Sequence, residues 1–316
     1  MISTVFEASL PIGEKLLVQK NRIEPEGKPA AARLSVVSGT HGDELEGQYV
    51  CYELARRINA SPEYLQGIVD IYPALNPLGI DMSTRLIPKK DLDLNRCFPG
   101  NAMGNMTERY ADAIVESLLG SHMVLDIHAS DMFVREIPQV RISREFSEKL
   151  LPFARQMNVD MIWMNETDVE HRATLAHTLN TLGVPTMVVE MGLGIRIDPV
   201  YGNQIVDGIF KLMSEMGIWT GPVARTHMPV ISSDGEVAFI RSNRPGIFLP
   251  AIEHSHYILP GQTIGILVDP YTGETLEKIC APRGGLLFSL RVNPMVYEGS
   301  LIARVLSERP DSGGAL

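Results

Sequence analysis

The sequence predicts an α/β protein with a doubly wound mixed sheet, followed by a smaller all-β segment. Short apolar runs alternate with stretches of helical periodicity through the first two thirds of the chain, which is the pattern of βαβ units. From about residue 221 the chain holds short alternating runs separated by Pro-Gly, Asp-Gly, Thr-Gly and Gly-Gly, without a clear helix. We therefore predict two domains, residues 1–220 and 221–316.

The predicted elements of the first half begin with weakly alternating edge strands in residues 1–33. Apolar runs then predict three strands, over residues 34–38, 68–72 and 123–127. Helical periodicity predicts helices over residues 48–58 and 107–119, with Thr107 as the N-cap of the second helix. A polar loop at residues 82–100, MSTRLIPKKDLDLNRCFPG, separates strand from helix, and a loop of this length is usually functional.

The second half of the predicted α/β region continues the same alternation. Strands are expected at residues 140–142, 161–164 and 186–189, and helices at 143–157, 175–182 and 198–216.

Composition excludes several classes of function. The 316 residues carry a net charge of −10, which argues against a nucleic-acid partner, although a local arginine cluster still permits an anionic substrate. The N-terminus lacks the pattern of a signal peptide, and no apolar run approaches the length of a membrane span. Three widely spaced cysteines fit reduced thiols. We predict a cytoplasmic protein that acts on a small molecule; the oligomeric state stays open, a homo-oligomer included.

Two histidines and a glutamate follow the ends of predicted strands. His41 and Glu44 lie on the turn after strand 34–38, and His128 comes directly after strand 123–127. Because open α/β sheets bind ligands at the carboxyl ends of their strands, these residues are candidates for one site. Such a set is typical of a catalytic zinc site that leaves a fourth position for water. Asp126, two residues before His128, is a candidate to orient that histidine.

Glu190 is the candidate for proton transfer. The apolar strand 186–189 ends at this residue, so we expect the carboxyl group to be buried. Burial raises the pKa of a carboxyl group, which suits a general base that later acts as an acid.

Five motifs in a fixed order resemble the succinylglutamate desuccinylase/aspartoacylase family: HGDELEG, NP followed by TR, DLDLNRCFPG, LDIHAS and VVEMG. They span residues of about 30–220. The resemblance implies a zinc-carboxypeptidase-like fold and one Zn²⁺ per chain, held by His41, Glu44 and His128. It further implies that Glu190 is the general base and that Arg85 polarises the scissile carbonyl and stabilises the oxyanion.

The resemblance also implies how a substrate is held. Asn95 and Arg96 match the pair that binds a substrate carboxylate, in keeping with the forked geometry of arginine and the directed donor of an amide. For the residue that grips the acyl end, Arg172 and Arg196 are the candidates.

The C-terminal segment at residues 273–305 resembles a biotinyl/lipoyl-like β-sandwich. Carrier domains of that type need a lysine at the tip of a hairpin, and the turn at residues 292–295 has none. We therefore interpret the segment as a structural cap that shapes the entrance to the site.

The function predicted from these residues is hydrolysis of the amide bond of an N-acyl amino acid or a similar small carboxylated amide. In this hypothesis zinc-bound water attacks the carbonyl, while Glu190 takes a proton and returns it to the leaving amine. Two alternatives stay open: a metallocarboxypeptidase acting on peptides, and a non-catalytic carboxylate-binding protein. The sequence does not determine the acyl group or the amine.

Overall fold

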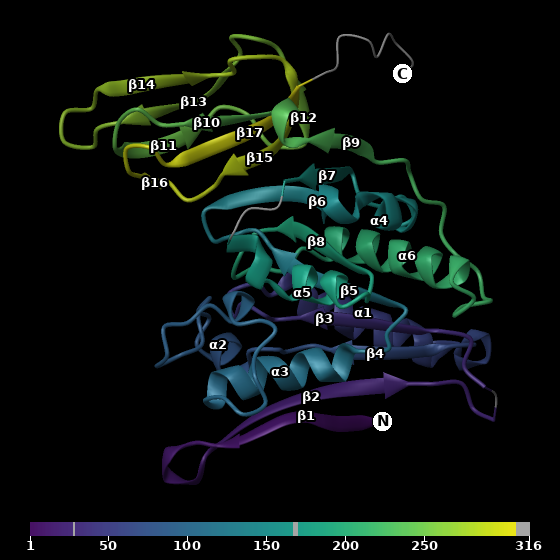
Figure 1. Ribbon diagram of the computed structural model, residues 1–316. Helices are drawn as coiled ribbons and strands as arrows, with labels where there is room; N and C mark the ends of the chain where they lie inside the picture. The colour runs from purple at the N-terminus through teal and green to yellow at the C-terminus, as the bar shows by residue number, and fades with distance from the viewer. Residues whose placement is uncertain (28, 167–169, 308–316) are drawn as a thin grey trace.

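A computed structural model describes residues 1–27, 29–166 and 170–307 of the chain. Within these ranges, no helix has both the length and the apolar character needed to cross a membrane. Figure 1 shows a long twisted sheet with helices packed along its central part and a layer of C-terminal strands at one end. The mixed α/β architecture agrees with the fold class that the sequence predicts.

Among the described residues, thirteen strands form one sheet with the central order β1-β2-β4-β3-β5-β8-β6-β15-β17-β10. The parallel centre consists of β4 (Ile68–Tyr72), β3 (Arg33–Ser38), β5 (Met123–Ala129) and β8 (Thr186–Gly192). On one side an antiparallel pair forms the edge, β1 (Ile2–Ser9) and β2 (Lys15–Ile23). On the other side lie β6 (Val134–Ser143), antiparallel to β8, and β7 (Met161–Asn165), parallel to β6.

Helices cover both faces of the central strands. One face packs on α1 (Glu46–Ala60), α4 (Ser147–Ala154) and α6 (Pro199–Glu215). The opposite face packs on α2 (Pro77–Asp81), α3 (Met106–Leu118) and α5 (Leu175–Thr181). Short 3-10 helices are η1 (Pro11–Gly13), η2 (Pro62–Tyr64), η3 (Leu94–Arg96), η4 (Arg144–Phe146), η5 (Glu170–Ala173) and η6 (Asp234–Glu236).

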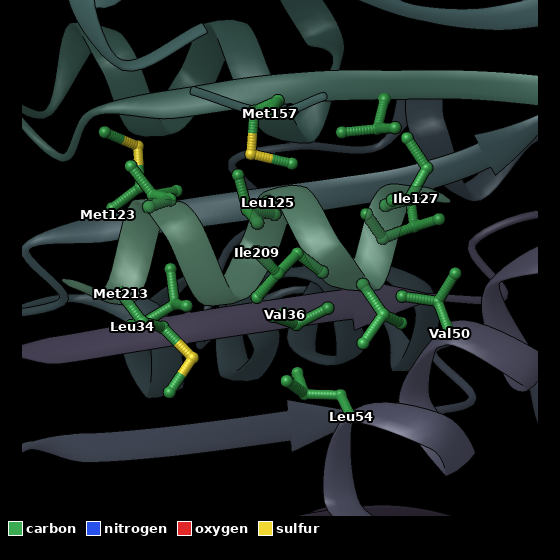
Figure 2. Packing of buried hydrophobic residues seen from close by; sticks show 14 of the residues in the cluster. Leu34, Val36, Val50, Leu54, Met123, Leu125, Ile127, Met157, Ile209 and Met213 are labelled. Carbon is green, nitrogen blue, oxygen red and sulfur yellow. The ribbon is translucent and has the colours of Figure 1, made fainter. Parts of the chain in front are cut away.

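The period of two along each strand divides the core between these faces. Met123, Leu125 and Ile127 of β5 point toward α1 and α6, where Figure 2 shows them beside Ile209 of α6. The alternate residues of β5, including His128, therefore point to the opposite face. This alternation separates an apolar layer from the layer that holds the candidate site.

The described residues after 220 form strands and connections, with η6 as the exception. β15 (Gly285–Arg291), β17 (Leu301–Ser307) and β10 (Val237–Arg241) continue the main sheet beyond β6, and β12 (His256–Ile258) pairs with β15. β9 (Val230–Ser233) pairs with β7. A second antiparallel sheet contains β14 (Thr275–Cys280), β13 (Thr263–Val268), β11 (Gly246–Pro250) and β16 (Met295–Val296). The predicted boundary near residue 220 and the biotinyl/lipoyl-like assignment stay predictions; residues 308–316 lie outside the described ranges.

Several details of the predicted elements are wrong. β6 begins at Val134 and not at residue 140, and Glu190 lies within β8, which continues to Gly192. The N-cap of α3 is Asn105 and not Thr107, because the Asn105 side chain accepts hydrogen bonds from two backbone amides while Glu108 bonds back to the Asn105 amide. His128 lies within β5 and not after it. The helix predicted over residues 143–157 is shorter, because η4 precedes α4 and α4 ends at Ala154.

The close approach of α6 to the chain before β7 yields a stability prediction. A Cβ atom built on Gly208 would lie 1.9 Å from the backbone oxygen of Met157, so this contact requires glycine. We expect Gly208→Ala to lower the free energy of unfolding by about 1–3 kcal/mol in urea denaturation, despite the higher helix propensity of alanine. Ser214→Ala in the same helix is the control, with a change within about 0.5 kcal/mol. A Gly208→Ala protein as stable as wild type would contradict the packing argument.

Candidate metal centre and active site

Three parallel strands bring the candidate residues to one edge of the sheet. β3 is followed by the turn that carries His41 and Glu44, just before α1 begins. His128 lies near the carboxyl end of β5, and Glu190 near that of β8. β5 and β8 pair so that His128 lies opposite Glu190. Residues from three separate motifs therefore meet where open α/β sheets place their binding sites.

The turn at residues 39–45 owes its shape to two glycines. Gly39 has a φ of +67°, which glycine adopts without strain. A Cβ atom on Gly42 would lie 1.9 Å from the backbone carbonyl carbon of Gly79 in α2, so only glycine permits this approach. The Gly42 amide also donates to the Thr84 carbonyl oxygen at 3.1 Å. The turn is thus fixed against α2 and the start of the long polar loop.

The donor atoms of His41, Glu44 and His128 converge. Nδ1 of His41 lies 2.7 Å from Oε1 of Glu44, and Nδ1 of His128 lies 2.7 Å from Oε2 of the same carboxylate. All three side chains are buried, and each offers one ligand atom within 4.8 Å of the others. In the part of the chain that the structure describes, this is the group of three or more such side chains with spacing suited to a metal ion.

A carboxylate lies behind each imidazole. Nε2 of His41 lies 3.1 Å from Oδ1 of Asp93, and Nε2 of His128 lies 3.1 Å from Oδ2 of Asp126. Asp126 is where the sequence led us to expect an orienting group. Asp93 was not identified from the sequence, although it lies in the DLDLNR motif and two residues before Asn95. Both histidines therefore have the outer carboxylate that is typical of metal-binding imidazoles.

The charges of this cluster determine its protonation. Burial lowers the pKa of His41, but the Glu44 carboxylate and the hydrogen bond to Asp93 outweigh burial and raise it. Burial also lowers the pKa of His128. The carboxylates of Asp126 and Glu44 outweigh this effect and raise the pKa well above its usual value. Burial raises the pKa of Glu44, but the two histidines lower it far below its usual range. Glu44 is consequently held as an anion, which is the form that binds a cation.

Glu190 has the environment expected of a proton-transferring group. Its side chain is 14% exposed, and Nη1 of Arg141 lies 3.3 Å from its Oε1. Burial raises the pKa of Glu190, and the opposing charges of Arg141 and His128 do not reverse that direction. A carboxyl group with a raised pKa can both accept and return a proton near neutral pH.

The long polar loop brings three further candidates to the same place. Arg85 donates to Oε1 of Glu44 at 3.1 Å and to Oδ2 of Asp93 at 3.2 Å. Asn95 Oδ1 accepts a hydrogen bond from the amide of Leu175 at 2.9 Å, which ties the loop to the first residue of α5. Arg96 donates to the Asn95 carbonyl oxygen at 2.9 Å.

These residues line a cavity of about 310 Å³, the size of a small-molecule site. His41, Glu44, His128, Glu190, Arg85, Asn95 and Arg96 all contribute to its wall. Other charged or titratable lining residues were not identified from the sequence: Asp131, Glu136, Arg141, His177 and Arg304.

The two arginines proposed from the sequence for the acyl end lie elsewhere. Arg172 and Arg196 are exposed and are not among the residues that line the cavity, and Arg196 donates to the carbonyl oxygen of Ile195. Arg141 and Arg304 line it instead. Neither arginine lies in one of the motifs. Arg304 reaches the site only through the pairing of β17 with β15 and of β15 with β6.

Curated and solved proteins resemble this chain over most of its length. N-alpha-acetyl-L-2,4-diaminobutyric acid deacetylase from Halomonas elongata is 28% identical over 288 residues, which is 88% of this chain and 83% of that protein. A crystal structure of a succinylglutamate desuccinylase/aspartoacylase from Rhodobacter sphaeroides has a TM-score of 0.81 and 21% identity, and the match covers 98% of this chain and 96% of that one.

A second solved structure is a product-bound ectoine utilization protein from Ruegeria pomeroyi. Its TM-score is 0.80 at 20% identity, with 96% of this chain and 93% of that chain covered. At these identities the two solved structures establish the fold alone.

The family itself is established by the sequence of the region that builds the site. The model of the succinylglutamate desuccinylase/aspartoacylase catalytic domain matches residues 30–216, which contain the three candidate metal ligands, Glu190 and the long polar loop. This match confirms the resemblance inferred from the motifs, and the chain belongs to the succinylglutamate desuccinylase/aspartoacylase family.

Proposed function

We propose that this protein is a zinc-dependent amidohydrolase that removes the acyl group from an N-acyl amino acid or a similar small carboxylated amide. The observation that carries the proposal is the convergence of His41, Glu44 and His128 beside Glu190 in a cavity lined by arginines. The deacetylase named for Halomonas elongata, similar over most of this chain, supports amide-bond deacylation.

The side chains present fit a zinc ion. Zn²⁺ accepts imidazole nitrogen and carboxylate oxygen, and three protein ligands are typical of its catalytic sites. The Nε2 atoms of His41 and His128 face Asp93 and Asp126, so the Nδ1 atoms are the ones turned toward the shared centre at Glu44. When bound in such a set, zinc acts as a Lewis acid and lowers the pKa of a water molecule to roughly 7.

Glu190 would act as the general base and then as the general acid. Its carboxylate would accept a proton from the attacking water and return it to the leaving nitrogen, so that the amine departs in neutral form. The strand pairing that sets Glu190 opposite His128 places this carboxylate beside the candidate metal ligands. Arg85, anchored on Glu44 and Asp93, would present positive charge to the carbonyl oxygen on which negative charge develops.

Asn95 and Arg96 would hold the substrate carboxylate. The Asn95 amide is oriented through its oxygen, which accepts from Leu175, and this leaves the amide nitrogen as a donor. Arg96 lies next in sequence and lines the same cavity. A guanidinium and an amide donor together match the planar geometry of a carboxylate.

We also propose that residues 1–220 form the hydrolase domain and that residues 221–316 form a β-sandwich cap. The support is that the family match ends at residue 216 and that Arg304 of β17 reaches the cavity wall. A cap that contributes to the wall restricts the substrate to a small molecule.

The metal requirement provides the direct test of function. Purified protein should hydrolyse members of a panel of N-acetyl and N-succinyl amino acids, lose activity on exhaustive chelation and regain it with zinc. Zinc at about 100 times its Kd should also stabilise the fold by roughly 2.7 kcal/mol in thermal unfolding. Full activity in protein shown by metal analysis to be free of divalent ions would refute the proposal. Release of C-terminal residues from free peptides, with no cleavage of the panel, would favour a carboxypeptidase.

Replacement of Glu190 by glutamine tests its role as the base. Glu190→Gln keeps the side-chain shape and removes the proton acceptor, so we expect kcat to fall by about 10²- to 10⁴-fold with the zinc content unchanged. The control is Glu116→Gln, an exposed residue of α3, which should retain wild-type kcat. A Glu190→Gln enzyme with normal turnover would assign the proton transfer to another group.

Asp93 is expected to affect zinc affinity through His41. Asp93→Asn preserves the size of the side chain but removes the charge behind the imidazole, and we expect zinc affinity to fall by about 10- to 100-fold. Competition with a chromophoric chelator measures this change, and Asp81→Asn, an exposed residue at the end of α2, serves as the control. Unchanged zinc affinity in Asp93→Asn would show that Asp93 only supports its loop.

A further inference from the structure

A row of alternating charges connects the candidate metal centre to the C-terminal strands. The row begins at Glu190, which lies opposite the candidate ligand His128 in the strand pairing, and continues through Arg141 and Glu136 to Arg304. Arg141 contacts Glu190 through Nη1 at 3.3 Å and Glu136 through Nη2 at 2.6 Å. Glu136 in turn accepts a hydrogen bond from Nη1 of Arg304. Each charge in the row has an opposite charge as its neighbour.

Strand register creates the outer end of this row. Ser289 of β15 lies opposite Glu136 of β6 and also opposite Arg304 of β17. The three residues therefore lie side by side across three adjacent strands. Nη1 of Arg304, which donates to Glu136, also lies 3.4 Å from the Ser289 hydroxyl oxygen. Arg304 lies outside residues 30–216, the range that the family model matches.

Glu136 is held firmly. Its side chain is 1% exposed, and its Oε2 accepts from both Arg141 and the Gln139 amide, the latter at 3.0 Å. A carboxylate this deeply buried requires paired charges, because an unpaired one would be strongly destabilising. Glu136 thus needs both arginines, and removing Arg304 leaves it with Arg141 as the remaining guanidinium partner.

The aromatic surroundings restrict both arginines. The guanidinium carbon of Arg141 lies 5.3 Å from the centre of the Trp163 ring, and that of Arg304 lies 6.0 Å from the same ring. Arg304 also lies 5.7 Å from the Phe239 ring. Cation–π contacts with a shared tryptophan add to the ion pairs in fixing the two side chains.

We infer that Arg304 is a positioning residue of the candidate active site. It holds Glu136, Glu136 holds Arg141, and Arg141 holds the carboxylate of Glu190 in place in the cavity. The inference rests on the proposed function for the role of Glu190. A purely structural role, in which the Arg304–Glu136 pair only fastens the C-terminal strands to β6, does not account for the division of the two Arg141 Nη atoms between Glu136 and Glu190.

Substitution of Arg304 separates positioning from fastening. In the zinc-loaded enzyme, Arg304→Met should lower kcat by about 10- to 100-fold, as loss of an orienting partner does in metal sites, with KM and zinc content nearly unchanged. The matched control is Arg291→Met. Arg291 is a buried arginine of neighbouring β15 that binds the carbonyl oxygens of Asn293, Leu301 and Met295 and does not line the cavity. The Arg291→Met enzyme should have a lower thermal stability than wild type and an unchanged kcat.

Two further variants test the order of action. Arg304→Lys retains a positive charge at Glu136 and should recover part of the lost kcat. Glu136→Gln should lower kcat about as much as Arg304→Met does. The double variant, Arg304→Met with Glu136→Gln, should have the same kcat as Glu136→Gln alone, because both changes break the same connection. Additive losses in the double variant would overturn the inference.

Crystal structures of wild type, Arg304→Met, Glu136→Gln and Arg291→Met supply a measurement that does not depend on turnover. The Arg141–Glu190 contact should persist in Arg291→Met and be lost in the other two variants. If the Arg141–Glu190 contact is retained in both Arg304→Met and Glu136→Gln, or if Arg304→Met has the wild-type kcat, the inference is overturned. If Arg304→Met does not fold, the contact and the kcat of Glu136→Gln decide in the same way. If the wild-type protein cleaves no amide of the panel, the proposed function fails, while the contact still decides whether Arg304 positions Glu190.

Discussion

The parallel pairing of β3, β5 and β8 is the constraint on which the site depends. Because these strands run in the same direction, their carboxyl ends lie at one edge, and the register of β5 with β8 sets His128 opposite Glu190. The alternation of side chains along β5 sends Leu125 and Ile127 into the apolar core, while His128 faces the cavity. A shift of one residue would exchange these faces and bury the imidazole among the helices of the other layer.

Compensation of buried charge is the second organising feature. Glu44 is buried, and its two oxygens face the imidazoles of His41 and His128. An aspartate lies beside the outer nitrogen of each imidazole. Glu190 of β8, Arg141 and Glu136 of β6, and Arg304 of β17 continue the alternation of sign. Desolvated charges remain in a protein interior when each has a partner of opposite sign. This pairing lets a site with many ionised groups lie within an ordinary apolar fold.

The C-terminal strands pair directly with strands of the α/β region. β15 hydrogen-bonds to β6, and β9 hydrogen-bonds to β7, so the main sheet passes without interruption into the C-terminal part of the chain. Arg304 extends this connection to the cavity wall. Changes in the C-terminal strands can therefore alter the geometry around Glu190 through hydrogen-bonded strands and paired charges.

The sequence by itself determined the fold class, most element positions and the convergence of His41, Glu44 and His128, because strand ends and short motifs are local features that carry their own periodicity and turn chemistry. It also placed Glu190 and the loop residues Arg85, Asn95 and Arg96 at the same edge. Only the tertiary structure revealed Asp93, Glu136, Arg141 and Arg304 as partners, since each acquires its role from contacts between distant strands or loops. Register across β6, β15 and β17 is a property of paired strands, and no single segment of the sequence contains it.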